Sequence, residues 1–387
     1  MNSSATFDRG RVLTPARSSC VPAPDLRAVC AAAVALGRAS AASGSSDAPS
    51  TANRNGAGDI APEPTLHAKP DPADATGAVR DDAGTAMGSD HPEYDAWDAL
   101  VRRAFRRTWR ARLRVTDGPG RRRQAALWGL VHVLWAATDL RDLGFEVPID
   151  DLVDLMRSFR RAAGFAAKPR TRRRYFDDNA WLGLVALALP EPELARELLA
   201  FVQTGEDPSG GILWVEGGTS RNTCSTASAA WLACSLGEDA FALHTMGWLN
   251  ATLRGPSGLY ADHIDGERID PTVYSYNQGA SVAALRMLGR SEEADATARS
   301  SLALFQGERL WHEPPPFLAI WFRALLALPS TQPEASALMA SYVERVLREA
   351  LDSGSGLFTR GGLGSYDRTT TIDQAAIIQI LAMRKKI

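Results

Sequence analysis

Two adjacent carboxylates in an aromatic frame are the residues of this chain best suited to chemistry. They are Asp177 and Asp178, in the segment Tyr-Phe-Asp-Asp-Asn-Ala-Trp at residues 175–181. If both are buried, one member relaxes the repulsion by keeping a proton, which separates their pKa values. A protonated carboxyl beside an ionised one is what hydrolysis of a glycosidic bond requires. In the alternative interpretation, one aspartate caps a helix and the other lies in solvent.

Aromatic residues recur in the longer loops at a spacing of roughly 50 residues, as expected for a repeated unit. They are Trp214, Tyr260, Trp311 and Phe358. Aromatic faces beside polar groups suit sugar rings, so these residues either line the rim of a sugar site or pack in the core. Asp262 and His263 follow Tyr260 closely and add polar partners, although His263 alone fits a structural histidine equally well.

Polar residues also open two of the later helices that the sequence predicts. Asn222 and Thr223 open one of them, where either could act as a cap. Tyr276, Asn277 and Gln278 lie early in the other, followed by a glycine. Consecutive amides beside a glycine that permits close approach fit the recognition of hydroxyl groups, and the alternative is a polar helix start with a packing glycine.

From His91 onward the apolar residues follow a helical period, which predicts an all-α domain over residues 91–387. Short breaks join the helices into pairs, and no strand set is predicted. Six such hairpins can close into an (α/α)6 barrel, which would gather the aromatic loops at one end; the alternative is an open solenoid. The predicted helices span 92–114, 121–141, 149–163, 176–189, 191–204, 221–236, 238–253, 271–288, 291–306, 315–328, 332–352 and 370–384.

Residues 1–90 are rich in Ala, Ser, Gly, Pro and Asp and contain neither Trp nor Tyr. Such a segment cannot bury enough apolar surface to offset the entropy lost on ordering, so we expect a disordered extension. The net charge of the whole chain is −2, which indicates no polyanionic partner such as nucleic acid. An arginine-rich run is therefore interpreted as a solvated helix face; it comprises Arg102, Arg103, Arg106, Arg107, Arg110, Arg112, Arg114 and Arg121 to Arg123.

The four cysteines are too few for a disulfide framework and lack zinc-ligand spacing, so no metal or other cofactor is expected. Reduced thiols favour the cytoplasm, as does the lack of a clear signal peptide. Export stays open, because residues 28–37 weakly resemble a signal-peptide core. No apolar run is long enough to span a membrane. The sequence does not indicate an oligomeric state.

Four motifs in matching order make residues 95–387 resemble glycoside hydrolase family 76, whose best-known members are endo-α-1,6-mannanases. They are Tyr-Phe-Asp-Asp-Asn-Ala-Trp at 175–181, Gly-Gly-Ile-Leu-Trp at 210–214, Arg-Asn-Thr at 221–223 and Tyr-Asn-Gln-Gly at 276–279. The resemblance implies an (α/α)6 barrel and retention of anomeric configuration, with Asp177 as nucleophile and Asp178 as general acid/base. Leu182 departs from the pattern, because many members have a second tryptophan there.

The sequence therefore predicts a retaining glycoside hydrolase that cleaves α-1,6-linked mannan or manno-oligosaccharides, with endo or exo action left open. One alternative is a sugar epimerase or isomerase on the same barrel, which would need acid–base histidines near the barrel centre. The other is a glycan-binding protein without activity. The expected substrate-binding residues are Asn179, Trp214, Asn222, Thr223, Tyr260, Asp262, His263, Tyr276, Asn277 and Gln278.

Overall fold

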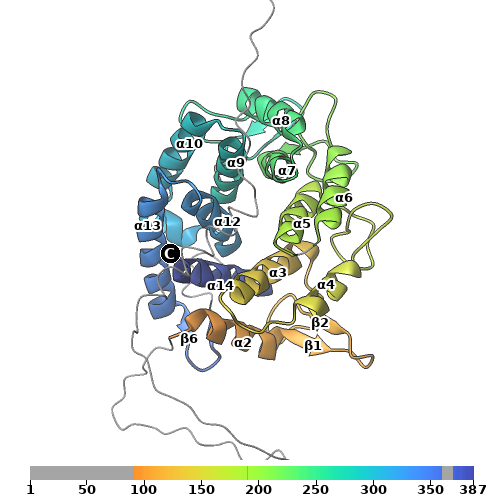
Figure 1. The fold of residues 1–387 in the computed structure, drawn as a ribbon, viewed down its shortest axis with the longest axis vertical. Coiled ribbons are helices and arrows are strands. Elements are labelled where there is room, and N and C mark those ends of the chain that lie inside the picture. The colour runs from red at the N-terminus through yellow and green to blue at the C-terminus, as the bar shows by residue number, and fades with distance from the viewer. Residues whose placement is uncertain (1–89, 190, 360–368) are drawn as a thin grey trace, which may run out of the picture. The chain divides into compact units, whose positions relative to one another are not determined.

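The computed structural model describes residues 90–189, 191–359 and 369–387. The extension predicted for residues 1–90 lies outside this part of the chain except for its last position. Among the described residues, six helices form an inner ring and six others surround it (Figure 1). The inner helices are α3 (Leu127–Asp142), α5 (Phe176–Ala188), α7 (Thr223–Ser235), α9 (Ser275–Met287), α12 (Pro315–Leu326) and α14 (Thr371–Lys385). The outer helices are α2 (Pro92–Ala104), α4 (Ile149–Arg157), α6 (Pro192–Gln203), α8 (Asp239–Thr252), α10 (Ser291–Leu304) and α13 (Gln332–Glu349).

The inner ring is closed. Each inner helix contacts the next one along the chain, and α14 at the end contacts α3 at the beginning. Each outer helix packs against the inner ring, with α2 lying on α14. The predicted (α/α)6 barrel of six helical hairpins is therefore confirmed, and an open solenoid is excluded. A short additional helix, α11 (Gly307–His312), was not predicted.

The inner helices are buried on almost all sides because small residues let them approach one another. In α7 the buried residues include an unbroken run from Thr223 to Ala230, all of them small. At Gly279 of α9 a Cβ atom would lie only 2.7 Å from the Cα of Trp321 in α12, so this position requires glycine. The packing interpretation of Gly279 is thus the one that the structure supports.

The outer helices instead bury one face. In α13 the buried residues are Ala335, Met339, Tyr342, Val343 and Val346, a spacing that places them along one stripe. Proline stands at the start of α2, α6 and α13, where its missing N–H is not needed. None of the described helices combines the length and the apolar character that crossing a membrane requires.

The loops that lead from an outer to an inner helix share a repeated turn. The chain reverses through a glycine with positive φ, as at Gly164, Gly258 and Gly356, and an antiparallel bridge closes the turn. The residue that ends the turn is buried: Phe165, Tyr260 and Phe358 are at most 1% exposed.

A side chain at the fourth position of the following inner helix binds the backbone of each turn. Asn179 accepts from the N–H of Phe165 (2.7 Å) and donates to its carbonyl (3.0 Å). Gln278 does the same at Tyr260, with both distances 2.9 Å, and Gln374 at Phe358, with 2.9 and 2.8 Å. Thr226 of α7 accepts from the N–H of Ile212 at 3.0 Å. We call the side chains of Asn179, Gln278 and Gln374 amide brackets. They fix the loops that precede their helices.

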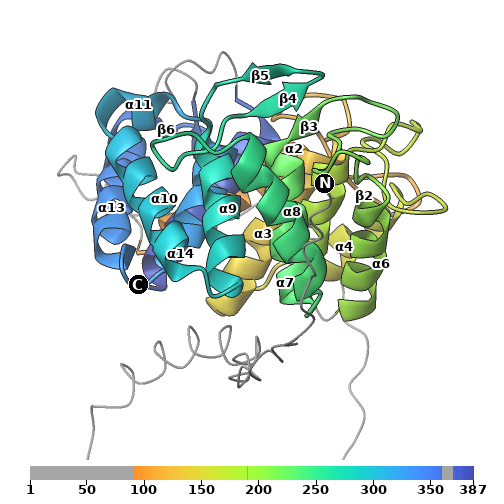
Figure 2. The ribbon, with the colours of Figure 1, turned by 90° about the horizontal axis from the view of Figure 1, so that it is seen from above.

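Short strands occupy the loops of the described residues. β3 (Arg221–Asn222), β4 (His263–Asp265) and β5 (Arg268–Asp270) form an antiparallel sheet at one end of the helices (Figure 2). β6 (Leu351–Asp352) pairs with β7 (Leu357–Phe358), and β1 (Phe105–Arg107) pairs with β2 (Leu113–Val115). The sheets are too short to form a layer of their own, so the all-α class holds.

The prediction of a helix over residues 92–114 is wrong beyond Ala104. There α2 ends, and the chain forms the β1–β2 hairpin with Phe105 opposite Val115. The apolar residues of β2 alternate with Arg114, a strand pattern that lets Val115 reach the core. The arginine run is therefore only partly on a helix, and its middle part lies on a hairpin.

A buried ion cluster joins the two ends of the ring. Asp139 of α3 is 3% exposed and receives Arg323 of α12 at 3.2 Å and Lys386, directly after α14, at 3.1 Å. Burial alone would raise the pKa of Asp139, but the charges of Arg323 and Lys386 outweigh it and the pKa is lowered. The cluster fastens the first inner helix to the last two.

We predict that Asp139→Ala lowers the free energy of unfolding by roughly 2–4 kcal/mol, because it removes the buried carboxylate that Arg323 and Lys386 share. Urea unfolding followed by circular dichroism measures this. Asp142→Ala is the matched control: Asp142 also contacts Lys386, at 3.4 Å, but its side chain is 39% exposed, so the loss stays below about 1 kcal/mol. Equal losses in the two variants would contradict a closing role for Asp139.

Candidate active site

The first turn of α5 carries the two aspartates. The helix begins at Phe176, whose N–H donates to the carbonyl of Trp214 at 3.0 Å, so the loop before α7 lies against the start of α5. Tyr175 is the N-cap residue and makes no side-chain cap bond. Asp178 is 8% exposed and Asp177 is half-buried. The interpretation in which one aspartate caps the helix and the other lies in solvent is therefore wrong.

Three donors hold the carboxylate of Asp177. Its Oδ1 accepts from the N–H of Asp178 at 2.9 Å. Its Oδ2 accepts from the indole Nε1 of Trp214 at 3.2 Å and from the thiol of Cys224 at 3.5 Å. Donors that bind the ionised form favour it, as does the N-terminal end of the helix dipole.

Burial raises the pKa of both aspartates above that of an ordinary carboxyl group. It raises the pKa of Asp177 to about 6, although the hydrogen bonds from Asp178, Cys224 and Trp214 oppose this. Burial raises the pKa of Asp178 further, and the negative charge of Asp177 adds to the effect. Near neutral pH the pair therefore favours a proton on Asp178 and a negative charge on Asp177. An acid stands directly beside an anion.

The same position on neighbouring inner helices supplies further residues of this site. Asp177, Cys224 and Tyr276 are each the second residue of an inner helix, α5, α7 and α9. Burial raises the pKa of Tyr276 well above its usual range, and the charges of Asp262 and Asp177 contribute. Its ring stacks on Phe317 with centroids 4.0 Å apart. The hydroxyl of Tyr276 thus stays protonated in a negatively charged pocket.

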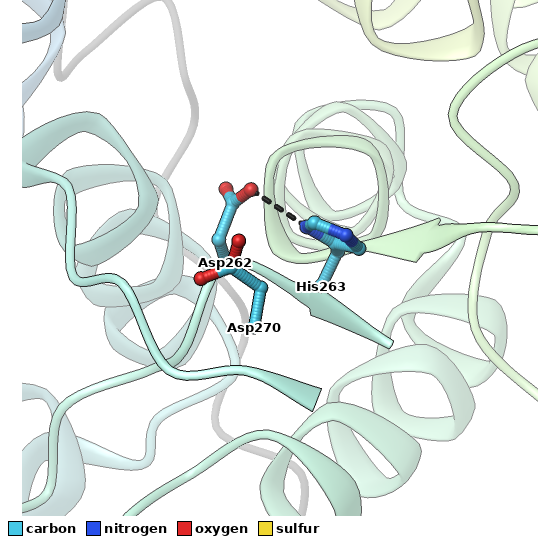
Figure 3. A group of neighbouring side chains, drawn as sticks. All are labelled: Asp262, His263 and Asp270. Atoms are coloured by element: carbon cyan, nitrogen blue, oxygen red, sulfur yellow. Dashed lines mark hydrogen bonds and ion pairs between the residues drawn. The ribbon is translucent and has the colours of Figure 1, made fainter. Parts of the chain in front are cut away.

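Asp262 stands at the edge of the β3–β5 sheet beside this pocket, held by two neighbours. Its Oδ1 accepts from the amide of Asn277 at 3.1 Å, and its Oδ2 lies 2.8 Å from Nδ1 of His263 (Figure 3). Asn277 is fully buried, and its own Oδ1 has no partner among the described residues. The oxygen is also screened from solvent, so the role of Asn277 in binding substrate stays a prediction.

Asp262, His263 and Asp270 also have the atom types of a metal site, with one ligand atom from each within 4.8 Å of the others. All three are half-buried. Figure 3 shows the three side chains close together. Both oxygens of Asp262 already have polar partners, Asn277 and His263, and these contacts orient the carboxylate.

Four residues predicted to bind substrate are buried and bonded within the chain. Asn179 and Gln278 are the amide brackets described above, and both are fully buried with their donors and acceptors on backbone groups. Thr223 is fully buried and donates to the carbonyl of Ala261 at 2.6 Å. Tyr260 is fully buried, and its hydroxyl contacts Asn250 at 2.5 Å. None of the four offers a free group to a ligand.

The aromatic residues of the loops divide in the same way. Trp214 is 40% exposed and contacts Asp177, which fits a rim position. Trp311 and Phe358 are at most 6% exposed and belong to the core, so their packing interpretation holds. Asn222 precedes α7 but makes no side-chain cap bond, and its Oδ1 accepts from Ser220 at 2.6 Å. Its role in binding substrate stays a prediction.

Cys224 is the site residue that sequence reasoning missed. A single buried thiol carries no recognisable motif, and no chemistry was expected of it. The available signal was its position: Cys224 is the second residue of inner helix α7, as Asp177 is the second residue of inner helix α5. Burial and the charges of Asp177 and Asp262 raise the pKa of this thiol well above its usual range, so it acts as a neutral donor.

No family model and no curated protein sequence matches the chain. Its fold, however, matches solved structures of family 76 glycoside hydrolases. One, from a bovine Bacteroides thetaiotaomicron strain, has a TM-score of 0.67 at 19% identity over 76% of each chain. A family 76 mannosidase from Bacteroides thetaiotaomicron has a TM-score of 0.66 at 18% identity, over 76% of this chain and 96% of the other.

A third match is an α-1,6-mannanase of family 76 from Salegentibacter sp. HEL1_6, with a TM-score of 0.62 at 19% identity, over 76% of this chain and 98% of that one. A variant of that enzyme with two adjacent aspartates replaced is described as inactive and was solved with α-1,6-mannotriose. These similarities confirm the sequence-based resemblance to family 76 at the level of the fold.

We predict that Asp178→Asn stabilises the protein at pH 7. The pKa of Asp178 is raised on folding, so the stabilising contribution of this carboxyl is complete below its unfolded pKa and is lost as the pH rises. An amide does not titrate, and the variant should gain roughly 1–3 kcal/mol at pH 7, with the gain vanishing near pH 4.

Urea unfolding of both proteins at several pH values measures this difference. Asp154→Asn is the control, because the Asp154 side chain is 75% exposed and its replacement should change stability by less than about 0.5 kcal/mol. If Asp178→Asn destabilises the protein at pH 7, the pair is not under the electrostatic strain described here.

Proposed function

We propose that this chain is a family 76 glycoside hydrolase that cleaves α-1,6-linked mannan with retention of anomeric configuration. The observation that carries the proposal is the adjacent carboxyl pair, in which burial and mutual repulsion favour a proton on Asp178 and a charge on Asp177. The similar fold of an α-1,6-mannanase supports it, as does the inactive variant of that enzyme lacking two adjacent aspartates.

In the first step, Asp178 gives its proton to the glycosidic oxygen as the bond from that oxygen to the anomeric carbon breaks. A carboxylate oxygen of Asp177 bonds to the same carbon from the opposite face. In the second step, water attacks the anomeric carbon, Asp178 accepts a proton from the water, and the bond to Asp177 breaks. Asp178 is then protonated again, and Asp177 is ionised again.

The remaining residues of the pocket bind and orient the sugar. The Tyr276 hydroxyl and the carboxylate of Asp262 provide a donor and acceptors for sugar hydroxyls, and the amide of Asn277 orients Asp262. His263 orients Asp262, and the exposed face of Trp214 offers a stacking surface at the rim. No step requires a metal ion or an organic cofactor.

The epimerase or isomerase alternative is less well supported. It needs a histidine able to exchange protons near the barrel centre. His132 lies in the inner ring, but burial and the charge of Arg323 lower its pKa to about 3, and its Nδ1 contacts Gln379. His263 is committed to Asp262. An activity assay distinguishes the proposed hydrolase from the other alternative, a glycan-binding protein without activity.

Incubation with linear α-1,6-mannan, followed by sizing of the products, tests the proposal. We predict that the wild-type chain releases oligosaccharides, whereas Asp177→Asn and Asp178→Asn each lose at least about 10³-fold in kcat. Asp373→Asn is the matched control, because Asp373 is a buried carboxyl in the first turn of α14 that has no adjacent carboxyl. A wild-type chain that binds mannan without cleaving it would support the binding-protein alternative.

We also predict that Cys224→Ala shifts the acidic limb of the kcat profile upward, by less than about one pH unit. The thiol donates to Asp177 and lowers its pKa, so its removal lets Asp177 protonate at a higher pH. Cys234→Ala is the control: Cys234 is buried in the same helix but contacts neither aspartate. Identical profiles for the two variants would show that the thiol does not act on Asp177.

A further inference from the structure

The β1–β2 hairpin, residues 105–115, presents a tryptophan to solvent. Trp109 lies in its turn and is 87% exposed, more than any other large apolar side chain of the described residues. The turn is well defined by backbone bonds, with the N–H of Thr108 donating to the carbonyl of Arg112 at 2.9 Å, and Ala111 has a φ of 57°. Figure 1 shows the hairpin projecting outward from the barrel. This indole offers a large apolar face with a polar N–H to any partner that approaches the hairpin.

The hairpin that carries this indole is rich in arginine. Arg106, Arg107, Arg110 and Arg112 are all exposed, and the guanidinium of Arg110 lies 4.3 Å from the centroid of the Trp109 ring. Only Arg107 pairs with a carboxylate of the described residues, Asp151. The hairpin therefore carries an excess of positive charge, although the whole chain has a net charge of −2.

The positive charge continues next to the hairpin. A hollow of about 960 Å³ separates it from the loop at residues 168–171, and Arg112, Arg114, Lys168 and Arg170 contribute to its lining. Asp151 and Asp154 line the side nearer α4. Anionic groups of a partner would meet cations at the turn and along this hollow.

We propose that the β1–β2 hairpin docks the protein onto an anionic lipid surface. Tryptophan suits the boundary between lipid headgroups and acyl chains, because its ring is apolar and its N–H is polar. Arginine stems lie along apolar surface while their guanidinium groups bind phosphates, and each cation near an anionic membrane strengthens binding. One exposed indole on an arginine-rich hairpin combines both interactions.

A nucleic acid is a poorer partner for this surface. Proteins that bind single strands stack successive bases on several aromatic platforms along a basic groove, whereas this hairpin offers one indole. Duplex binding would need a helix or a longer ribbon to enter a groove. The hairpin is three residues long on each side, which limits it to a surface contact.

Docking would orient the barrel. The hairpin follows the C-terminus of outer helix α2, and the loops that carry Trp214 and Asp262 follow the C-termini of outer helices α6 and α8. All three segments lead into inner helices, so they lie at the same end of the barrel. The membrane-bound protein would hold its candidate active site near the lipid surface. Lipid binding itself does not depend on the proposed glycosidase activity.

Co-sedimentation of the full chain with vesicles tests the proposal. We expect binding to phosphatidylcholine vesicles that contain phosphatidylglycerol, weakening as salt is added, and no binding to phosphatidylcholine alone. The double variant Arg110→Glu with Arg112→Glu should bind at least about 30-fold more weakly. Trp109→Ala should lower binding several-fold at every salt concentration, because the lost interaction is apolar.

The matched control is Arg196→Glu with Arg299→Glu, which changes the net charge equally at two arginines of outer helices, each 59% exposed. It should bind vesicles as the wild type does, and unchanged thermal unfolding of all variants checks that they fold. Failure of the wild type to bind anionic vesicles, or equal weakening by the control, would overturn the proposal. So would binding to single-stranded or duplex DNA, lost in the hairpin variants, with no vesicle binding.

Discussion

The repulsion between two neighbouring carboxyl groups in a largely dehydrated pocket is the constraint on which the site depends. Asp177 and Asp178 are adjacent in the chain, and the negative charge of Asp177 raises the pKa of Asp178. The repulsion is relieved by a proton on Asp178 and by three donors around Asp177. The pair is consequently unfavourable for stability near neutral pH and useful for acid-assisted chemistry, a compromise typical of functional sites.

The barrel gives this pair a rigid surrounding. The closed inner ring leaves the helix starts little freedom, and the amide brackets at the fourth helical position tie each loop to the helix that follows it. Helical geometry determines which side chains face the site and which bind the preceding loop. In α5 and α9 the second and third residues, such as Asp177, Asp178 and Tyr276, belong to the site, whereas the fourth residue points back at the loop, because neighbours on a helix differ in direction by about 100°.

This geometry also explains what the sequence could predict. Helical periodicity located the helical hairpins and hence the barrel. The aspartate pair was recognisable because two carboxylates lie side by side among aromatic residues. Asn277 and Gln278 are adjacent amides that look alike in the sequence. Asn277 contacts Asp262 at the site, whereas Gln278 binds the preceding loop, because a step of one residue along a helix turns the side chain by about 100°. The β1–β2 hairpin escaped prediction because arginine and alanine favour a helix, while the burial of Val115 favours a strand. Cys224 became visible only through its contact with Asp177.

The central claim is that Asp177 and Asp178 act as nucleophile and acid in a retaining reaction. Proton NMR of the first product released from α-1,6-mannan tests it most directly, because the anomeric signal appears before mutarotation mixes the two forms. The account predicts that the α anomer appears first and the β anomer only later. Initial release of the β anomer would mean direct attack by water, which would contradict the assignment of Asp177 as the nucleophile.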